Sequence, residues 1–173
     1  LSQIVEDLNL KKYGYEVLLR NPSSFTPLPN GEYLILGSDR KENIRQISKF
    51  SKSDAEAYPK YDNALDEIAT LADTMLTMTP PNIPPYTLND ITKCVKLFSE
   101  LAKLGPTANV RFFKLLTQDA RKFLDSWFES EPLKATLLTD SAIGAMDFSG
   151  YVLLHHVMGE AGGARGVWGY QRG

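Results

Sequence analysis

The sequence has little of what several large protein classes require. Cys94 is its one cysteine, which excludes an internal disulfide framework and a multi-cysteine zinc site. No stretch approaches the roughly 18 uninterrupted apolar residues of a membrane-spanning helix, and no signal-peptide pattern opens the chain. The 19 basic and 21 acidic side chains give a net charge of -2. A general attraction to nucleic acid is therefore not expected.

Motifs for nucleotide binding and hydrolysis are also missing. The sequence contains no G-x-G-x-x-G after a strand, no G-x-x-x-x-G-K-[ST], no H-E-x-x-H and no G-x-S-x-G. The run from Gly159 to Gly163 resembles a phosphate loop only in its glycine content, because it lacks the lysine and the strand-to-helix context. The chain begins at Leu1 without methionine, and we expect it to be a piece of a longer protein.

The sequence predicts an α+β fold that is mainly α, and its 173 residues fit one compact domain or one domain with an appendage. We expect residues 1–38 to form a small β-hairpin or sheet, because residues 15–19 and 33–36 are rich in β-branched and aromatic side chains. The pair Asn30-Gly31 favours a hairpin turn, since both residues tolerate a positive φ. Residues 39–145 are predicted to be a helical substrate or cap region, and residues 146–173 a glycine- and aromatic-rich cavity-lining segment.

Two capping boxes mark the start of the helical region, one from Asp39 with Glu42 and one from Ser53 with Glu56. The second precedes apolar residues at spacings of three and four, which predict one continuous buried stripe. The stripe consists of Tyr58, Tyr61, Leu65, Ile68, Ala72 and Met75. Pro59 is expected to kink this helix or to mark its first turn.

A proline-rich linker at 79–86 separates this helix from the next, because its four prolines remove backbone donors. The next helix is predicted to start near Asn89 and to stop at Gly105-Pro106. Its buried residues should be Ile91, Val95, Phe98 and Leu101. Further short helices are expected over 110–116, over 120–128, and from a cap at Ser130 to about Ile143.

The two histidines, His155 and His156, are candidates for a general base or a metal ligand. Adjacent residues point about 100° apart on a helix and to opposite faces on a strand, so the pair does not close easily on one metal ion. We therefore expect no metal site, with one histidine hydrogen-bonded in the interior and the other at a surface or pocket wall. Cys94 is interpreted as a buried structural thiol.

Charge is segregated along the chain, with acidic residues gathered over 54–73 and basic residues over 93–122. One interpretation is that these are solvated faces of a helical layer. The other is that the basic stretch, with its phenylalanines, contacts anionic lipid or a protein partner. The residues expected in such a contact are Arg111, Phe112, Phe113 and Lys114.

Several stretches carry a family resemblance: residues 20–31, 49–58, 127–135, 150–159 and 168–170. In this order they resemble flavin-dependent oxidoreductases of the phytoene desaturase type. The resemblance implies a considerably longer flavoprotein, in which an FAD-binding Rossmann domain is built from the terminal segments and a middle segment covers the flavin. This chain resembles that middle segment. It lacks the family's dinucleotide fingerprint and its flavin-contacting glycine motif.

Two functions follow as hypotheses. The first is the substrate or cap region of an FAD-dependent oxidoreductase acting on an apolar substrate, not competent alone, with FAD bound in the parent and none in this chain. The expected partner of this region is the remaining FAD-binding domain of the parent protein. The expected location is intracellular, and the resemblance implies mitochondria. No catalytic residue is assigned. The residues expected to line its cavity are Tyr151, His155, His156, Trp168 and Tyr170. The second is a non-catalytic helical module that docks on a protein partner or membrane surface through 107–128, without nucleic acid.

Overall fold

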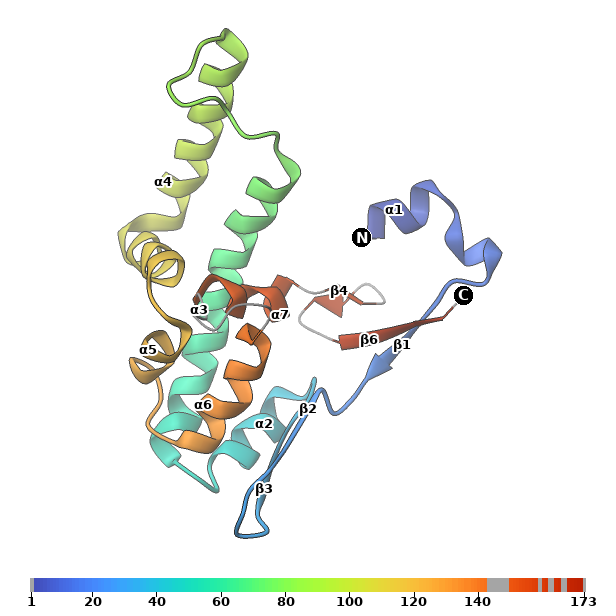
Figure 1. Ribbon diagram of the computed structural model, residues 1–173, viewed down its shortest axis with the longest axis vertical. Helices are drawn as coiled ribbons and strands as arrows, with labels where there is room; N and C mark the ends of the chain where they lie inside the picture. Colours follow the sequence, from blue (N-terminus) through green and yellow to red (C-terminus); the bar gives the residue numbers. More distant parts are fainter. Residues whose placement is uncertain (1, 143–149, 159, 162–163, 166–167, 173) are drawn as a thin grey trace.

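The computed structural model describes residues 2–142, 150–158, 160–161, 164–165 and 168–172. The prediction of a mainly helical fold with a small antiparallel sheet near the N-terminus is confirmed (Figure 1). In chain order the elements are α1 (Ser2–Asp7), η1 (Leu10–Tyr13), β1 (Glu16–Arg20), β2 (Ser24–Pro27), β3 (Tyr33–Leu36), α2 (Arg40–Ile47), α3 (Lys52–Thr77), α4 (Leu88–Thr117), α5 (Ala120–Asp125), α6 (Glu131–Leu138), η2 (Thr139–Ser141), η3 (Gly150–Leu153), α7 (Leu154–Met158), β4 (Glu160–Ala161), β5 (Ala164–Arg165) and β6 (Trp168–Arg172).

The hairpin is formed by β2 and β3, which pair antiparallel from Ser24 opposite Leu36 to Pro27 opposite Tyr33. The Gly31 amide donates to the Leu28 carbonyl at 3.0 Å, and Gly31 has a φ of 84°. Asn30 does not share this positive φ, so the expected turn with both residues left-handed is wrong. The hairpin instead has a three-residue loop, in which a tight turn is followed by one glycine with a positive φ, Gly31. Pro29 occupies the second position of this turn, which proline favours.

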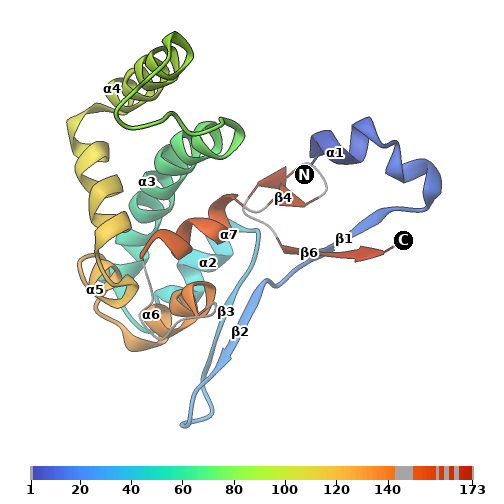
Figure 2. The same cartoon turned by 45° about the horizontal axis from the view of Figure 1, so that its top comes forward.

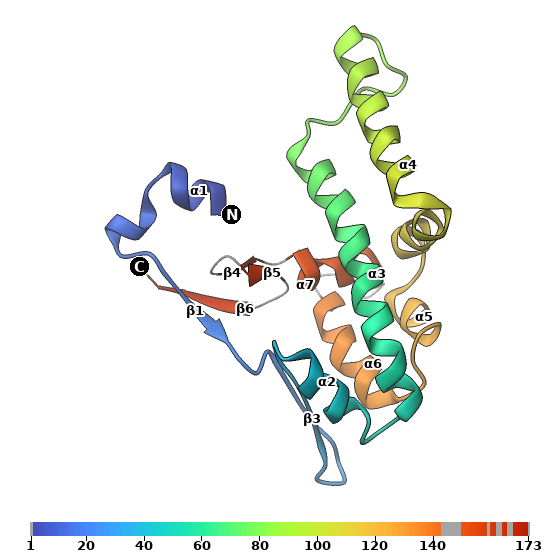
Figure 3. The same ribbon diagram turned by 180° about the vertical axis from the view of Figure 1, so that it is seen from behind.

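The strand β1 does not join this hairpin but pairs antiparallel with β6, more than a hundred residues along the chain. In this register Leu18 lies opposite Tyr170 and Arg20 opposite Trp168. The β1–β6 ribbon stands beside the helical layer, with both ends of the chain on the same side (Figures 1 and 3). Two neighbouring leucines on β1 have little cover, since Leu18 is 44% and Leu19 57% exposed.

The long helix α3 is the centre of the helical layer. Tyr61, Leu65, Ile68 and Ala72 are all at most 4% exposed, which confirms the predicted stripe over these positions. Met75, its last member, is 39% exposed. Pro59 lies inside α3.

The predicted capping boxes are only partly correct. Asp39 caps α2, but the Glu42 carboxylate accepts hydrogen bonds from Arg45 and Gln46. The helix α3 begins two residues earlier than a cap at Ser53 predicts, because Ser51 is its cap and the Ser51 Oγ accepts from the Asp54 amide at 3.0 Å. The proposed box of Ser53 and Glu56 is therefore wrong.

The helix α4 is kinked at Gly105, whose φ of 80° and ψ of 167° are not helical. The predicted helix end at Gly105 corresponds to this break. However, a second helical segment follows directly, with Pro106 in its first turn. The Asn109 side-chain amide donates to the Leu101 carbonyl at 2.7 Å and so bridges the break. Before the kink, the predicted burial is wrong for Ile91, Val95 and Phe98, which are 47%, 63% and 68% exposed.

The end of the helical region also differs from expectation. The helix α6 ends at Leu138 and is followed by the 3-10 turn η2, while Ile143 lies outside the described residues. The Ser130 hydroxyl does not cap α6 but donates to the Asp54 carboxylate on α3. Cys94 is half-buried rather than buried.

Candidate functional site

The segment of η3 and α7, residues 150–158, is fixed across the helical layer by a close backbone contact. The Gly150 amide donates to the Gln118 carbonyl at 3.0 Å. A Cβ on residue 150 would lie 2.8 Å from the Leu115 carbonyl oxygen, so this approach requires glycine. Leu153, Leu154 and Val157 are buried in the core, and this burial holds the segment against α3.

An apolar hollow opens where this segment meets α3 and α4. Its volume is about 230 Å³, and it is lined by Ala72, Met75, Phe112, Leu116 and Tyr151. Hydrocarbon and aromatic walls favour an apolar group. A pocket for a whole ligand usually exceeds about 300 Å³, so this hollow is suited to part of a larger apolar molecule.

A polar cleft of about 210 Å³ lies on the other side of the same segment, between α2, α3, α6 and the β2–β3 hairpin. Arg40 is one of its lining residues. Its guanidinium donates to the Pro59 carbonyl and to Asn63 Oδ1, and Arg40 Nε lies 3.4 Å from Asp62 Oδ2. Asn43 is likewise engaged, with hydrogen bonds to both the amide and the carbonyl of Gly37. Arg40 and Asn43 are therefore held by neighbouring groups, and their polar atoms stabilise the fold around the cleft.

Leu153 and Val157 line this cleft, whereas Tyr151 lines the apolar hollow. The predicted cavity segment therefore borders both recesses. His155 and His156 belong to α7, and Trp168 and Tyr170 belong to β6, but their side chains lie outside the described part. Their role in a cavity wall stays a prediction. Among the described residues, no group of three side chains is placed to hold a metal ion.

The four residues predicted to contact a membrane or partner do not form one surface. Phe112 is 3% exposed and belongs to the core, so its expected surface contact is wrong. The Arg111 guanidinium lies 5.4 Å from the centre of the Trp127 ring, a cation–π distance. Phe113, at 55% exposed, and Lys114 remain at the surface.

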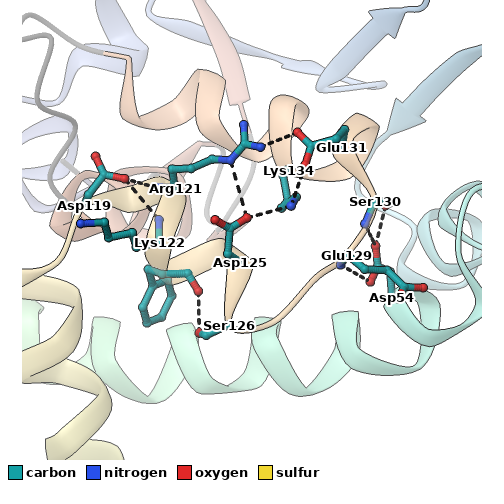
Figure 4. A network of polar contacts seen from close by, with 11 residues as sticks. Asp54, Asp119, Arg121, Lys122, Asp125, Ser126, Glu129, Ser130, Glu131 and Lys134 are labelled. Carbon is teal, nitrogen blue, oxygen red and sulfur yellow. Dashed lines mark hydrogen bonds and ion pairs between the residues drawn. The ribbon is translucent and has the colours of Figure 1, made fainter.

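A buried polar joint, which the sequence did not predict, connects α3 to the start of α6 (Figure 4). Asp54 is 1% exposed, and its carboxylate accepts from the Glu129 and Ser130 amides, each at 2.9 Å. The Ser130 hydroxyl donates to the same carboxylate at 2.5 Å. The Asp54 carboxylate therefore fixes the two residues that lead into α6, while no described side chain caps the first turn of α6 itself.

A second part of the joint surrounds Lys134, whose side chain is 8% exposed. Its ammonium donates to Asp125 at 2.7 Å and lies 2.8 Å from Glu131. The hydrogen bond from Lys134 is the main cause that lowers the pKa of both carboxyl groups. The hydrogen bonds to Asp125 and then Glu131 raise the pKa of Lys134 in turn. This joint holds α5 and α6 together at the base of the site.

The residues described here do not fit a dinucleotide phosphate. The strand β3 does lead through Gly37 into α2. However, the Asp39 carboxylate already accepts from the amides of Lys41 and Glu42, at 2.9 and 3.4 Å. A phosphate needs these same amides and meets a negative charge there instead.

Comparison with known proteins gives homology to part of a longer protein. The chain is 43% identical to pyridine nucleotide-disulfide oxidoreductase domain-containing protein 2 of Rattus norvegicus and 40% identical to that of Mus musculus, over 189 and 191 residues. Each match covers 99% of this chain and 32% of the relative. The chain thus spans about a third of the length of these curated relatives. No family model and no solved structure matches the sequence.

Proposed function

We propose that this chain is the substrate or cap region of an FAD-dependent oxidoreductase of the phytoene desaturase type, acting on an apolar substrate. The observation that carries the proposal is homology along 99% of the chain to about a third of a relative whose name describes an oxidoreductase domain. The flavin binds to the remaining part of the longer polypeptide, which is this chain's partner. We also propose a mitochondrial location, as the family resemblance implies, which fractionation of the source cells tests.

The chain's own contribution is to bind and orient the substrate and to exclude water. The apolar hollow takes an apolar portion of the substrate between Met75, Phe112 and Leu116, where burial of apolar surface contributes about 25 cal/mol per Å². Tyr151 lines one edge of the hollow. The Gly150 contact with α4 keeps Tyr151 at this edge.

The hydride chemistry is that of the bound flavin. We assign no catalytic group to the described residues. Arg40 and Asp62 of the polar cleft are paired with each other, and the N-terminus of α2 is closed by Asp39. The 173-residue chain alone is therefore expected to bind no flavin and to turn over no substrate.

The flavin content of two purified proteins tests this proposal. The longer protein that contains this segment should carry one flavin per chain, and the 173-residue chain should be colourless after gel filtration. In the longer protein, Met75→Glu should keep the flavin but lose reduction by apolar substrates, because a carboxylate in the hollow opposes their burial. Met75→Leu is the matched control and should stay active. A longer protein without flavin would contradict the proposal.

A second candidate function, a non-catalytic module that docks on a protein partner or membrane, is favoured by a different observation. Val110, Phe113 and Leu116 are 56%, 55% and 39% exposed on the second half of α4. Lys114 lies among them. A flavin-free longer protein that still associates with a partner through Phe113 would favour this function over the first.

A further inference from the structure

The β1–β6 ribbon is set apart from the helical layer in every view of the molecule (Figures 1, 2 and 3). Among the described residues, β1 has one strand partner, β6, so one edge of β1 faces β6 and the other edge faces no strand. Alternate amide and carbonyl groups of an antiparallel strand point to opposite sides. Half of the backbone groups of β1 therefore point away from β6 and meet no described strand.

The sequence of β1 does not protect this open edge. Sheets usually protect an edge strand with a proline, a lysine, a bulge or a covering segment. The strand reads Glu-Val-Leu-Leu-Arg, without proline or lysine. Its register with β6 runs without a bulge, from Glu16 opposite Arg172 to Arg20 opposite Trp168. The charged residues stand only at its two ends, and an apolar edge of this kind is a site for pairing with a further strand.

The side chains of β1 show that neither face of the ribbon is well covered. Consecutive residues of a strand point to opposite faces, so Leu18 and Leu19 lie on different faces, and they are 44% and 57% exposed. A strand with one solvated face alternates apolar and polar residues, whereas an unbroken apolar run is typical of a strand buried on both faces. An isolated pair of strands is marginally stable in water. The run from Val17 to Leu19 therefore suits a larger, covered sheet.

We propose that the open edge of β1 pairs with a strand of the remaining polypeptide of the longer protein, and that apolar residues beside that strand cover Leu18 and Leu19. Each curated relative is matched over 32% of its length, so most of such a polypeptide lies outside these residues. The first and last described elements, α1 and β6, lie on the ribbon's side of the molecule (Figures 1 and 3). The proposal rests on this difference in length and not on the bound flavin.

A second copy of this chain also offers an open β1 edge. However, a strand within the same polypeptide acts at an effective concentration of about a millimolar, which exceeds the concentration of a second copy in dilute solution. A lipid surface is not a suitable occupant, because it supplies no hydrogen bonds for the amide and carbonyl groups of the edge. Among the described helices, none is long and apolar enough to cross a membrane.

Hydrogen–deuterium exchange followed by mass spectrometry tests the proposal in two proteins, the 173-residue chain and the longer protein that contains it. In the 173-residue chain, the β1 amides that point away from β6 should exchange as fast as those of an unstructured peptide. In the longer protein they should exchange at least about tenfold more slowly, because carbonyl groups of the added strand accept them. A peptide of residues 61–72 of α3 is the internal control and should be strongly protected in both proteins.

Leu19→Lys places a charge on the edge strand and beneath the proposed cover. In the longer protein it should return the β1 amides to the fast exchange of the 173-residue chain, because a lysine opposes edge pairing. In the 173-residue chain it should leave the urea midpoint unchanged, since Leu19 is 57% exposed there. Leu19→Ile is the matched control, because isoleucine is apolar and favours strands, and β1 should stay protected in this variant of the longer protein.

Equal exchange of the β1 amides in the two proteins would overturn the proposal. Unchanged protection of β1 in the Leu19→Lys variant of the longer protein would also overturn it, provided that residues 61–72 show the helical layer to be folded. Protection in the 173-residue chain that disappears on dilution, with a dimer in light scattering, would assign the edge to a second copy instead. A longer protein with protected β1 amides and no flavin would support this proposal while contradicting the proposed function.

Discussion

The two halves of α4 have similar amphipathic sequences and opposite surroundings. Before Gly105, Val95 and Phe98 are 63% and 68% exposed, whereas after it Phe112 and Leu115 are 3% and 0% exposed. The second half contributes Phe112 and Leu115 to the core, whereas Leu101 and Leu104, which pack against the core from the first half, are half-buried. Periodicity thus identifies which residues share a face, and the rest of the fold decides whether that face is covered.

The largest expected effect is a difference in unfolding free energy between a variant in the second half of α4 and one in the first half. Leu115→Ala should lower the free energy of unfolding by about 2–5 kcal/mol, because it leaves a cavity in the packed core. Val95→Ala, at an exposed position in the first half of α4, should change the free energy of unfolding by at most about 0.5 kcal/mol. Urea unfolding followed by circular dichroism measures both. Equal shifts of the two midpoints would show that the halves are packed alike.

The buried joint should matter nearly as much as the core. Asp54→Ala removes the acceptor for two backbone amides and one hydroxyl, and we expect a loss of about 3 kcal/mol in unfolding free energy. Glu56→Ala, an exposed carboxylate on the same helix, is the matched control and should change stability by at most about 0.5 kcal/mol. An Asp54 variant as stable as the Glu56 variant would show that the entry to α6 needs no support from α3.

A smaller effect is expected at the crossing of η3 and α4. Gly150→Ala should cost about 1–3 kcal/mol, because its Cβ would overlap the Leu115 carbonyl oxygen at 2.8 Å and the backbone must shift. Val152→Ala, at a half-buried neighbouring position, serves as the control for side-chain loss. A Gly150→Ala variant with an unchanged urea midpoint would mean that this crossing is loosely packed.

The smallest expected effect is the sensitivity of the start of α4 to low pH. The hydrogen bond from the Thr87 hydroxyl, with bonds from Asn82, lowers the pKa of Asp90 from 3.8 to about 2. Because the folded pKa is depressed, the carboxylate stabilises the fold above pH 3.8, and this stabilisation is lost as the pH falls towards 2.

Asp90→Asn should therefore remove part of the acid sensitivity of α4 helicity in this pH range. Circular dichroism during an acid titration measures it, with Asp66→Asn as an exposed control. Identical titrations of the unchanged chain and the Asp90 variant would contradict the capping role of this carboxylate.

Local signals predicted much of the helical layer. The stripe from Tyr61 to Ala72 could be recognised because apolar residues repeat with the helical period over about three turns, and these residues are buried. The cap of α3 was misplaced because Ser51 and Ser53 are equally suitable in type. Ser51 is also tied to Glu129 by a hydrogen bond at 2.7 Å, a contact that no local pattern reveals.

Contacts between distant segments account for what the sequence did not predict. The pairing of β1 with β6 joins strands that have no shared local signal. Asp54 was counted among solvated acidic residues, whereas its partners at 129 and 130 remove it from water. Tyr151 was predicted from glycine spacing and aromatic character, and it does border an apolar hollow.

Photocrosslinking of the intact longer protein, reconstituted with an azido derivative of FAD, tests the central claim most directly. If this chain caps the flavin, the label should attach to a peptide of residues 150–158, which contains Tyr151 and borders both recesses. Labelling confined to the polypeptide outside these 173 residues would contradict the claim.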